Sequence, residues 1–114
     1  MTTLYGIANC DTVKKARKWL EQENISYQFH DFRKDGFDEA LLESFLTTLG
    51  WEELLNKRST SFRNLDDSIK QNLSEQTAKE AMLAEPTLIK RPVLVTDSVK
   101  QVGFKADQYA TLFK

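Results

Sequence analysis

The sequence predicts an α/β fold with a mixed sheet. The chain opens with a strand–helix–strand pattern, and it closes with two short strands followed by a helix. The segment between these patterns is helical in character. With 114 residues, 40% of them hydrophobic and 29% charged, the chain has the size and composition of one globular domain. We therefore expect a single domain over residues 1–114.

The N-terminal pattern indicates a βαβ unit. Residues 4–7 are apolar and precede turn-forming residues at positions 9–12, after which apolar residues recur at helical spacing over 13–20. Residues 25–30 then alternate apolar and polar side chains, as a half-buried strand does. Such a crossover makes the two strands parallel, and open α/β sheets usually bind ligands at the loop that follows the first strand. We therefore expect chemistry near Cys10.

The middle of the chain is predicted to be mostly helical. Residues 41–49 carry an apolar stripe between Asp38, a candidate N-cap, and Gly50, a candidate C-cap. Residues 56–64 are polar and are predicted to form a loop. A further helix around residues 78–82 is expected to end before the next proline, because the residue that precedes a proline avoids the helical region.

The C-terminal pattern indicates a hairpin and a helix. Residues 93–95 and 100–103 flank the turn-forming pair at 97–98, which is typical of a β-hairpin. Apolar residues at 109, 112 and 113 are spaced as on one face of a short amphipathic helix.

Charge and composition exclude several functional classes. Sixteen basic residues against seventeen acidic ones give a net charge of −1, which favours neither nucleic acid nor an anionic membrane as a partner. We expect the basic run at residues 14–18 to be the solvated face of the first helix. No apolar run approaches the roughly 20 residues of a membrane helix, and the start of the chain lacks a secretory pattern. We therefore expect a cytoplasmic protein with no membrane and no nucleic-acid partner.

Cys10 is the candidate nucleophile. It lies where the first loop meets the first helix, and there the unpaired N–H groups and the helix dipole favour a thiolate over a thiol. Asn9, Asp11 and Thr12 are all good N-cap residues, so the sequence defines the first residue of the helix only to within a residue or two. The alternative is a buried cysteine that only fills space, which is the commoner fate of a lone cysteine.

The chain contains one cysteine, so any redox cycle requires a thiol from outside. A valine, Val13, stands three residues after Cys10, where two-cysteine redox motifs carry the second thiol. Glutathione is the natural partner for a mixed disulfide. With a single cysteine and a single histidine we expect no bound metal.

Arg91 is the candidate anion-binding residue, because its guanidinium can hold a carboxylate or an oxyanion. It precedes Pro92 just before a predicted strand, where a cis bond is a possibility that the sequence leaves open. The alternative is a solvated arginine at a strand edge.

Five separated segments of the chain carry a familiar pattern. They are residues 5–16, 31–36, 54–60, 89–92 and 102–105. Together and in this order they resemble the arsenate reductase family (ArsC-like), in particular its YffB branch, and more distantly the Spx/MgsR regulators. The resemblance spans nearly the whole chain, and it implies a thioredoxin-like fold with an inserted helical subdomain at about residues 31–90.

The resemblance also implies residue roles. In the family, a cysteine at the first helix attacks the oxyanion, arginines hold its charge, and glutathione with glutaredoxin completes the reduction. Matched by position, Cys10 is the nucleophile, and Arg91 is the arginine before a structural cis-proline, Pro92. The chain departs from the family pattern after the last strand, where Lys105 replaces an arginine and loses its bidentate fork.

A second departure lies in the helical insertion. Asn56 stands where family arsenate reductases have an arginine, and Arg58 follows two positions later. Asparagine provides neither the charge nor the fork of donors, so this difference counts against arsenate as substrate. The Spx comparison departs at Val13, because the redox switch of those regulators needs a second cysteine there.

The sequence thus predicts a glutathione-dependent thiol oxidoreductase that forms a mixed disulfide with glutathione and has no bound cofactor. Glutaredoxin or a protein thiol is a further expected partner. The alternatives are an arsenate reductase proper and a non-catalytic protein-interaction module related to Spx. The predicted site has Cys10 as catalytic residue, Pro92 as a structural residue, and a substrate- or glutathione-binding set of Asn9, Thr12, Arg58, Arg91 and Lys105.

Overall fold

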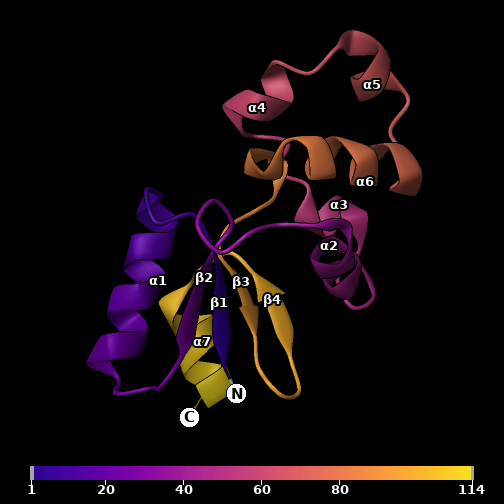
Figure 1. The fold of residues 1–114 in the computed structure, drawn as a ribbon. Helices are drawn as coiled ribbons and strands as arrows, with labels where there is room; N and C mark the ends of the chain where they lie inside the picture. The colour runs from indigo at the N-terminus through magenta and orange to yellow at the C-terminus, as the bar shows by residue number, and fades with distance from the viewer. Residues whose placement is uncertain (1, 114) are drawn as a thin grey trace. The chain divides into compact units, whose positions relative to one another are not determined.

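A four-stranded mixed sheet organises the first part of the fold (Figure 1). The computed structural model describes residues 2–113. Strands β1 (Thr3–Gly6), β2 (Gln28–Asp31), β3 (Val93–Val95) and β4 (Lys100–Val102) lie in the order β2-β1-β3-β4. Strand β1 pairs with β2 in parallel and with β3 antiparallel, and β3 pairs antiparallel with β4. The predicted mixed α/β sheet and its parallel first pair are confirmed.

Helix α1 (Asp11–Gln22) connects β1 to β2. The chain turns after this helix at Asn24, whose φ of 57° lies in the left-handed region. The prediction of a strand from residue 25 was wrong, since β2 begins only at Gln28. Ile25 and Tyr27 instead pack against the hydrophobic core as part of the connecting loop, and this burial explains their alternation with polar residues.

One hydrophobic core holds α1, the sheet and the C-terminal helix α7 (Ala106–Phe113) together. The rings of Trp19 and Tyr109 meet edge to face, with centroids 5.7 Å apart, so the two helices lie side by side against the sheet. The buried members of this core are Leu4, Ala16, Leu20, Leu94 and Tyr109.

The segment Phe37–Lys90 forms a second compact unit, which is helical. The first unit comprises the residues up to Gly36 and those from Arg91 onward. The insertion was predicted at about 31–90, whereas β2 and the turn after it extend the first unit to Gly36. That all of residues 1–114 form one domain stays a prediction. The second unit contains α2 (Glu39–Leu46), α3 (Trp51–Leu54), α4 (Thr60–Arg63), α5 (Asp67–Gln71), α6 (Glu75–Ala84) and the 3₁₀ helix η1 (Pro86–Leu88).

Helix caps in the second unit confirm one prediction and correct two. Asp38 caps α2 as expected, since its carboxylate accepts the N–H of Leu41 at 2.9 Å. Gly50 was predicted to end that helix, but α2 ends at Leu46 and Gly50 is the N-cap of α3. The polar segment 56–64 is not wholly a loop, because Ser59 caps a helical turn, α4.

Paired contacts join elements within the second unit. Lys79 on α6 lies 2.6 Å from a carboxylate oxygen of Glu43 and 3.0 Å from one of Glu39, both on α2. Leu55 and Ile89 form an isolated antiparallel bridge, which brings the residue after α3 beside the residue after η1. Both bridge residues are buried.

A close contact at Gly6 fixes α1 against the end of β1. A Cβ atom added at Gly6 would lie 2.8 Å from Cγ2 of Val13, a distance that real Cβ atoms essentially never show. Val13 is fully buried and β-branched, so its side chain has little freedom to move aside. Glycine at this position therefore determines how near the start of α1 lies to the strand.

We expect Gly6→Ala to lower the free energy of unfolding by about 1–3 kcal/mol, the usual range for overpacking. Urea denaturation measures the change. The double variant Gly6→Ala/Val13→Ala should lose less than the sum of its single changes, because Val13→Ala removes the clashing methyl groups. The control is Gly50→Ala, whose new Cβ meets nothing within 4 Å. Equal losses in Gly6→Ala and Gly50→Ala would contradict the steric explanation.

Candidate active site

Cys10 occupies the N-cap position of α1. Its backbone is extended, with φ −135° and ψ 125°, and its carbonyl accepts the N–H of Lys14 at 2.9 Å. The sequence left the cap open among Asn9, Asp11 and Thr12, and the structure assigns it to the cysteine itself. The side chain of an N-cap residue is the group that normally faces the first amides of a helix.

The start of α1 surrounds Cys10 with donors and leaves its sulfur accessible. The Cys10 side chain is partly exposed and makes no capping hydrogen bond. The first N–H groups of an α-helix have no partner within the helix, and the helix dipole places positive potential there. The start of α1 therefore offers hydrogen-bond donors to an anion beside Cys10, and partial exposure gives a substrate access to the sulfur. Asp11 and Thr12, the first two helical residues, are exposed beside it.

Strand register brings Arg91 and Pro92 to the end of the sheet from which the Cys10 loop departs. Val93 pairs with Tyr5, so Pro92 lies next to the carboxyl end of β1. The Arg91–Pro92 peptide bond is cis. Arg91 is partly buried, and the Pro92 carbonyl accepts the N–H of Gly103 at 2.8 Å.

Lys105 belongs to the same end of the sheet, because it follows Gly103 by two residues. Gly103 has φ +80°, which glycine adopts without strain. The buried Tyr109 holds this segment, since its hydroxyl donates to the Gly103 carbonyl at 3.1 Å and its N–H donates to the Lys105 carbonyl at 3.0 Å. Burial raises the pKa of Tyr109, so its hydroxyl remains a donor. Lys105 itself is exposed.

The remaining predicted residues lie in different places. Asn9 is exposed in the bend between β1 and α1, directly before Cys10. Arg58 belongs to the second compact unit, where it is exposed and its N–H donates to the Asn56 side chain at 3.0 Å. The participation of Arg58 at Cys10 therefore stays a prediction, as do the binding roles of the other residues.

Asp31 was not selected from the sequence as a site residue. It ends β2 beside Gly6, and it is buried with 6% of its surface exposed. One carboxylate oxygen accepts the N–H of Ala8 at 3.2 Å, within the Cys10 loop. The other accepts the N–H groups of Arg33 at 2.8 Å and Lys34 at 3.3 Å. An aspartate at the end of a strand neighbouring the loop is the signal that could have identified it.

Hydrogen bonding keeps the Asp31 carboxylate ionised. Burial acts to raise the pKa of this group, but the backbone N–H groups of Arg33, Ala8 and Lys34 outweigh that effect, and the Lys34 charge adds to them. The pKa is therefore lowered from the ordinary value of 3.8. The carboxylate is charged at neutral pH.

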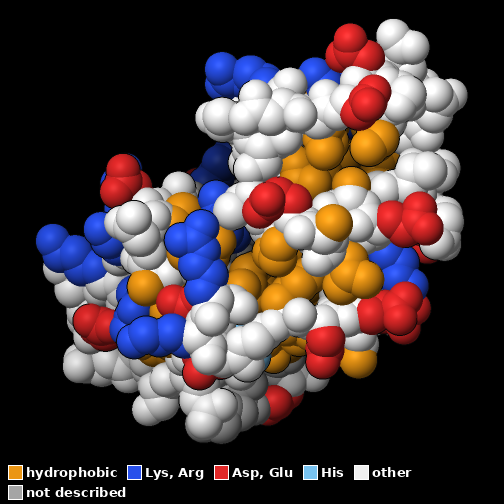
Figure 2. All heavy atoms as spheres, turned by 45° about the horizontal axis from the view of Figure 1, so that its top comes forward, with side chains coloured by type: hydrophobic (Ala, Val, Ile, Leu, Met, Phe, Trp, Pro, Cys, Tyr) orange, Lys and Arg blue, Asp and Glu red, His pale blue; other side chains and the backbone are white. Residues whose placement is uncertain are grey.

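The sequence predicts that the whole basic face of α1 is solvated, and the structure corrects this prediction at one residue. Lysine and arginine side chains gather at the left of Figure 2, on the side where α1 lies in Figure 1. Arg17 is nonetheless partly buried, with its guanidinium 4.2 Å from the centroid of the Phe29 ring. Its Nε also donates to the Tyr27 hydroxyl at 3.1 Å. This arginine on α1 therefore contacts both β2 and the loop that precedes β2.

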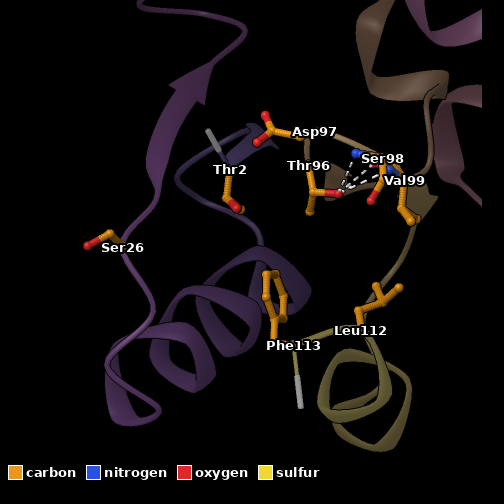
Figure 3. Close-up of a pocket in the computed structure, with 8 residues that line it drawn as sticks. All are labelled: Thr2, Ser26, Thr96, Asp97, Ser98, Val99, Leu112 and Phe113. Atoms are coloured by element: carbon orange, nitrogen blue, oxygen red, sulfur yellow. Dashed lines mark hydrogen bonds between the residues drawn. The ribbon is translucent and has the colours of Figure 1, made fainter.

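A cavity of about 500 Å³ lies at the opposite end of the sheet from Cys10 (Figure 3). Figure 3 shows the Thr96 hydroxyl bonded within the turn between β3 and β4, where it accepts the N–H groups of Ser98 and Val99. The cavity therefore takes no part in chemistry at the sulfur. It is lined by Thr2, Ser26, Thr96, Asp97, Ser98, Val99, Leu112 and Phe113.

Two kinds of feature are absent from residues 2–113. Within this range no helix is long and apolar enough to cross a membrane. The same residues contain no group of three or more His, Cys, Asp or Glu side chains arranged to hold a metal ion.

Comparison with known proteins agrees with this arrangement. The model of the ArsC family matches residues 5–112. The chain belongs to the ArsC family. An uncharacterized protein of Haemophilus influenzae is 48% identical over 113 residues, which is 99% of each chain. The predicted membership in the arsenate reductase family is thereby confirmed.

Solved structures confirm the fold of this ArsC-family chain. The protein YffB is 46% identical and matches with a TM-score of 0.91 over 97% of both chains. An arsenate reductase related protein from Brucella melitensis is 50% identical, with a TM-score of 0.82 over 99% of this chain and 94% of the other. These neighbours support the predicted YffB branch and the thioredoxin-like α/β fold.

The more distant resemblance to Spx is also confirmed. The global transcriptional regulator Spx of Listeria innocua is 30% identical over 110 residues, covering 95% of this chain and 83% of that protein. In this chain the third residue after Cys10 is the buried Val13, and the sequence contains no second cysteine. A disulfide within this chain is therefore excluded.

We expect Asp31→Asn to reveal the ionised state of Asp31 through the pH dependence of stability. Because the folded pKa is below the unfolded value of 3.8, the carboxylate stabilises the fold above that pH, and this stabilisation is lost as the pH falls further. The difference in free energy of unfolding between wild type and Asp31→Asn should be steady near neutrality and shrink below about pH 4. Urea unfolding across this range measures it. A difference that stays constant down to about pH 2.5 would contradict the assignment.

Proposed function

We propose that the protein is a glutathione-dependent thiol oxidoreductase in which Cys10 forms a mixed disulfide with glutathione. The observation that carries the proposal is the single cysteine of the chain at the N-cap of α1, partly exposed at the carboxyl end of β1. Membership in the ArsC family and the likeness to an arsenate reductase related protein support thiol chemistry. We place the activity in the cytoplasm, where glutathione is abundant and keeps thiols reduced.

The reaction proceeds in two exchange steps. The Cys10 thiolate attacks the glutathione sulfur of a mixed disulfide between glutathione and a substrate thiol. The Cys10–glutathione bond forms, the substrate disulfide breaks, and the substrate leaves as its thiolate. The thiolate of a second glutathione then attacks the glutathione sulfur bound to Cys10. Oxidised glutathione forms, and the Cys10 thiolate is released for another cycle.

The cations at the same end of the sheet suit glutathione, which carries two carboxylates. Arg91 precedes β3 and Lys105 follows the segment anchored by Tyr109, so both backbones lie where the Cys10 loop departs. A guanidinium binds a carboxylate through two parallel hydrogen bonds, and an ammonium binds it as a point charge. In the proposal Arg91 and Lys105 orient glutathione, with Asn9 and Thr12 beside the sulfur.

Arsenate is a poorer fit for these residues. A small oxyanion requires several converging donors, and in this chain Asn56 and Lys105 stand where arsenate reductases of the family have arginines. The loss of the two guanidinium forks removes bidentate contacts that lysine and asparagine do not replace. We therefore propose a disulfide, and not arsenate, as the substrate.

We expect folded wild-type protein to take up one glutathione per chain when incubated with oxidised glutathione, because Cys10 is its only thiol. Intact mass spectrometry detects the adduct, and reduced glutathione should remove it. The control Cys10→Ser should gain no mass. The proposal would be falsified if no adduct formed, or if the folded chain reacted no faster than the same chain unfolded in urea.

We expect Arg91→Ala to slow the exchange with oxidised glutathione about tenfold, the worth of one charge-assisted hydrogen bond of about 1.5 kcal/mol. Exchange with the neutral hydroxyethyl disulfide should change little, because that reagent has no carboxylate. Stopped-flow measurement with both reagents separates binding from intrinsic reactivity. Lys18→Ala is the matched control, since it removes an exposed cation two turns further along α1. Equal slowing with both disulfides would show that Arg91 does not recognise glutathione.

A further inference from the structure

Asp31 is the one charged side chain that is buried among residues 2–113. A charge is costly to bury unless hydrogen bonds compensate it, and three backbone N–H groups supply them here. The helix start and the cations described above do not require this carboxylate. Its presence beside the Cys10 loop therefore calls for a physical explanation.

The two oxygens of Asp31 bind two different segments. Oδ1 accepts the N–H groups of Arg33 and Lys34, which closes the turn after β2. Oδ2 reaches across to Ala8, two residues before Cys10. The turn is held independently as well, because Asp35 accepts the Asp31 N–H at 2.9 Å through its side chain. The bond to Ala8 therefore serves the cysteine loop and not the turn.

The bond to Ala8 fixes the middle of a short loop whose two ends are already fixed. At one end Gly6 belongs to β1 and its carbonyl accepts the N–H of Phe32 at 2.8 Å. At the other end α1 is packed through Val13 against Gly6. The hydrogen bond at Ala8 therefore restricts the peptide groups that lead into Cys10, between two ends that are themselves held.

We propose that Asp31 is a positioning residue that sets the reactivity of Cys10 through the Ala8 N–H. The inference rests on the proposed function, because it assigns a purpose to the orientation of a reacting sulfur. Displacement of a reacting group by about 1 Å can cost up to about a hundredfold in rate, so a single hydrogen bond to the loop has a measurable effect.

Asparagine at position 31 separates the two contacts. The carboxylate offers acceptors on both sides, whereas the amide has one acceptor oxygen and one NH₂ donor group. If the oxygen keeps the N–H groups of Arg33 and Lys34, the NH₂ group faces the N–H of Ala8 and no hydrogen bond forms. Asp31→Asn is therefore expected to release the loop while the turn remains closed.

The test is the alkylation rate of Cys10 by iodoacetamide, a small neutral reagent, measured against pH on folded protein. We expect Asp31→Asn to lower the maximal rate about tenfold. The matched control is Asp35→Asn, which removes one charge from the same turn without touching the loop and should react as wild type does. Loss of stability alone would not lower the rate of molecules that circular dichroism shows to be folded.

An unchanged or higher rate in Asp31→Asn, or an equal loss in Asp35→Asn, would overturn the inference. Should Asp31→Asn fail to fold, Ala8→Pro removes the same hydrogen bond from the donor side, and the same decrease is expected. A wild-type rate in folded Ala8→Pro would also overturn it. Alkylation needs no glutathione, so this result stays distinct from a failure of the mixed-disulfide experiment.

Discussion

The pairing of β1 with a strand on each side determines what lies beside Cys10. Its parallel neighbour β2 places Asp31 next to Gly6, and its antiparallel neighbour β3 places Pro92 at the same end. The loop to α1 leaves β1 between these two neighbours. A buried carboxylate and a cationic segment, far apart in the sequence, therefore flank one cysteine because of backbone pairing.

Glycine at the end of the central strand adds a steric condition to this pairing. The contact between Gly6 and Val13 sets the approach of α1, and Val13 is also the residue that replaces a second cysteine. The residue that packs the start of α1 against β1 thus occupies the position that holds the second thiol in two-cysteine proteins. In the proposed reaction the second thiol therefore comes from outside this chain, because Cys10 is its single cysteine.

Sequence reasoning was most successful where a pattern was local. The strand–helix–strand start, the hairpin and the cysteine at the helix start follow from periodicity and turn residues over a few positions. It was wrong at Ile25, whose apolar side chain packs in a loop, and at Gly50, which begins one helix instead of ending another. At Ile25 the deciding contacts are tertiary, and they leave no mark in the local pattern. Gly50 makes local bonds instead, since its carbonyl accepts the N–H groups of Glu53 and Leu54, and a glycine alone does not show whether a helix ends or begins there.

In the candidate site, Asp31 is the residue that a local sequence pattern could not identify. Its carboxylate contacts Ala8, which is 23 residues away in the sequence, and that contact exists only once β1 and β2 are paired. Cys10 could be selected from its own surroundings, because the end of a helix is a local feature. A residue that acts on the loop from a neighbouring strand becomes visible only in three dimensions.

The first unit is built from two stretches of chain, with Phe37–Lys90 between them. During synthesis β1, α1 and β2 leave the ribosome early, while the second neighbour of β1 follows only after the whole helical segment. Closing so long a loop delays the antiparallel half of the sheet. In the nascent chain the cysteine is thus translated long before β3, whose pairing places Pro92 next to the carboxyl end of β1.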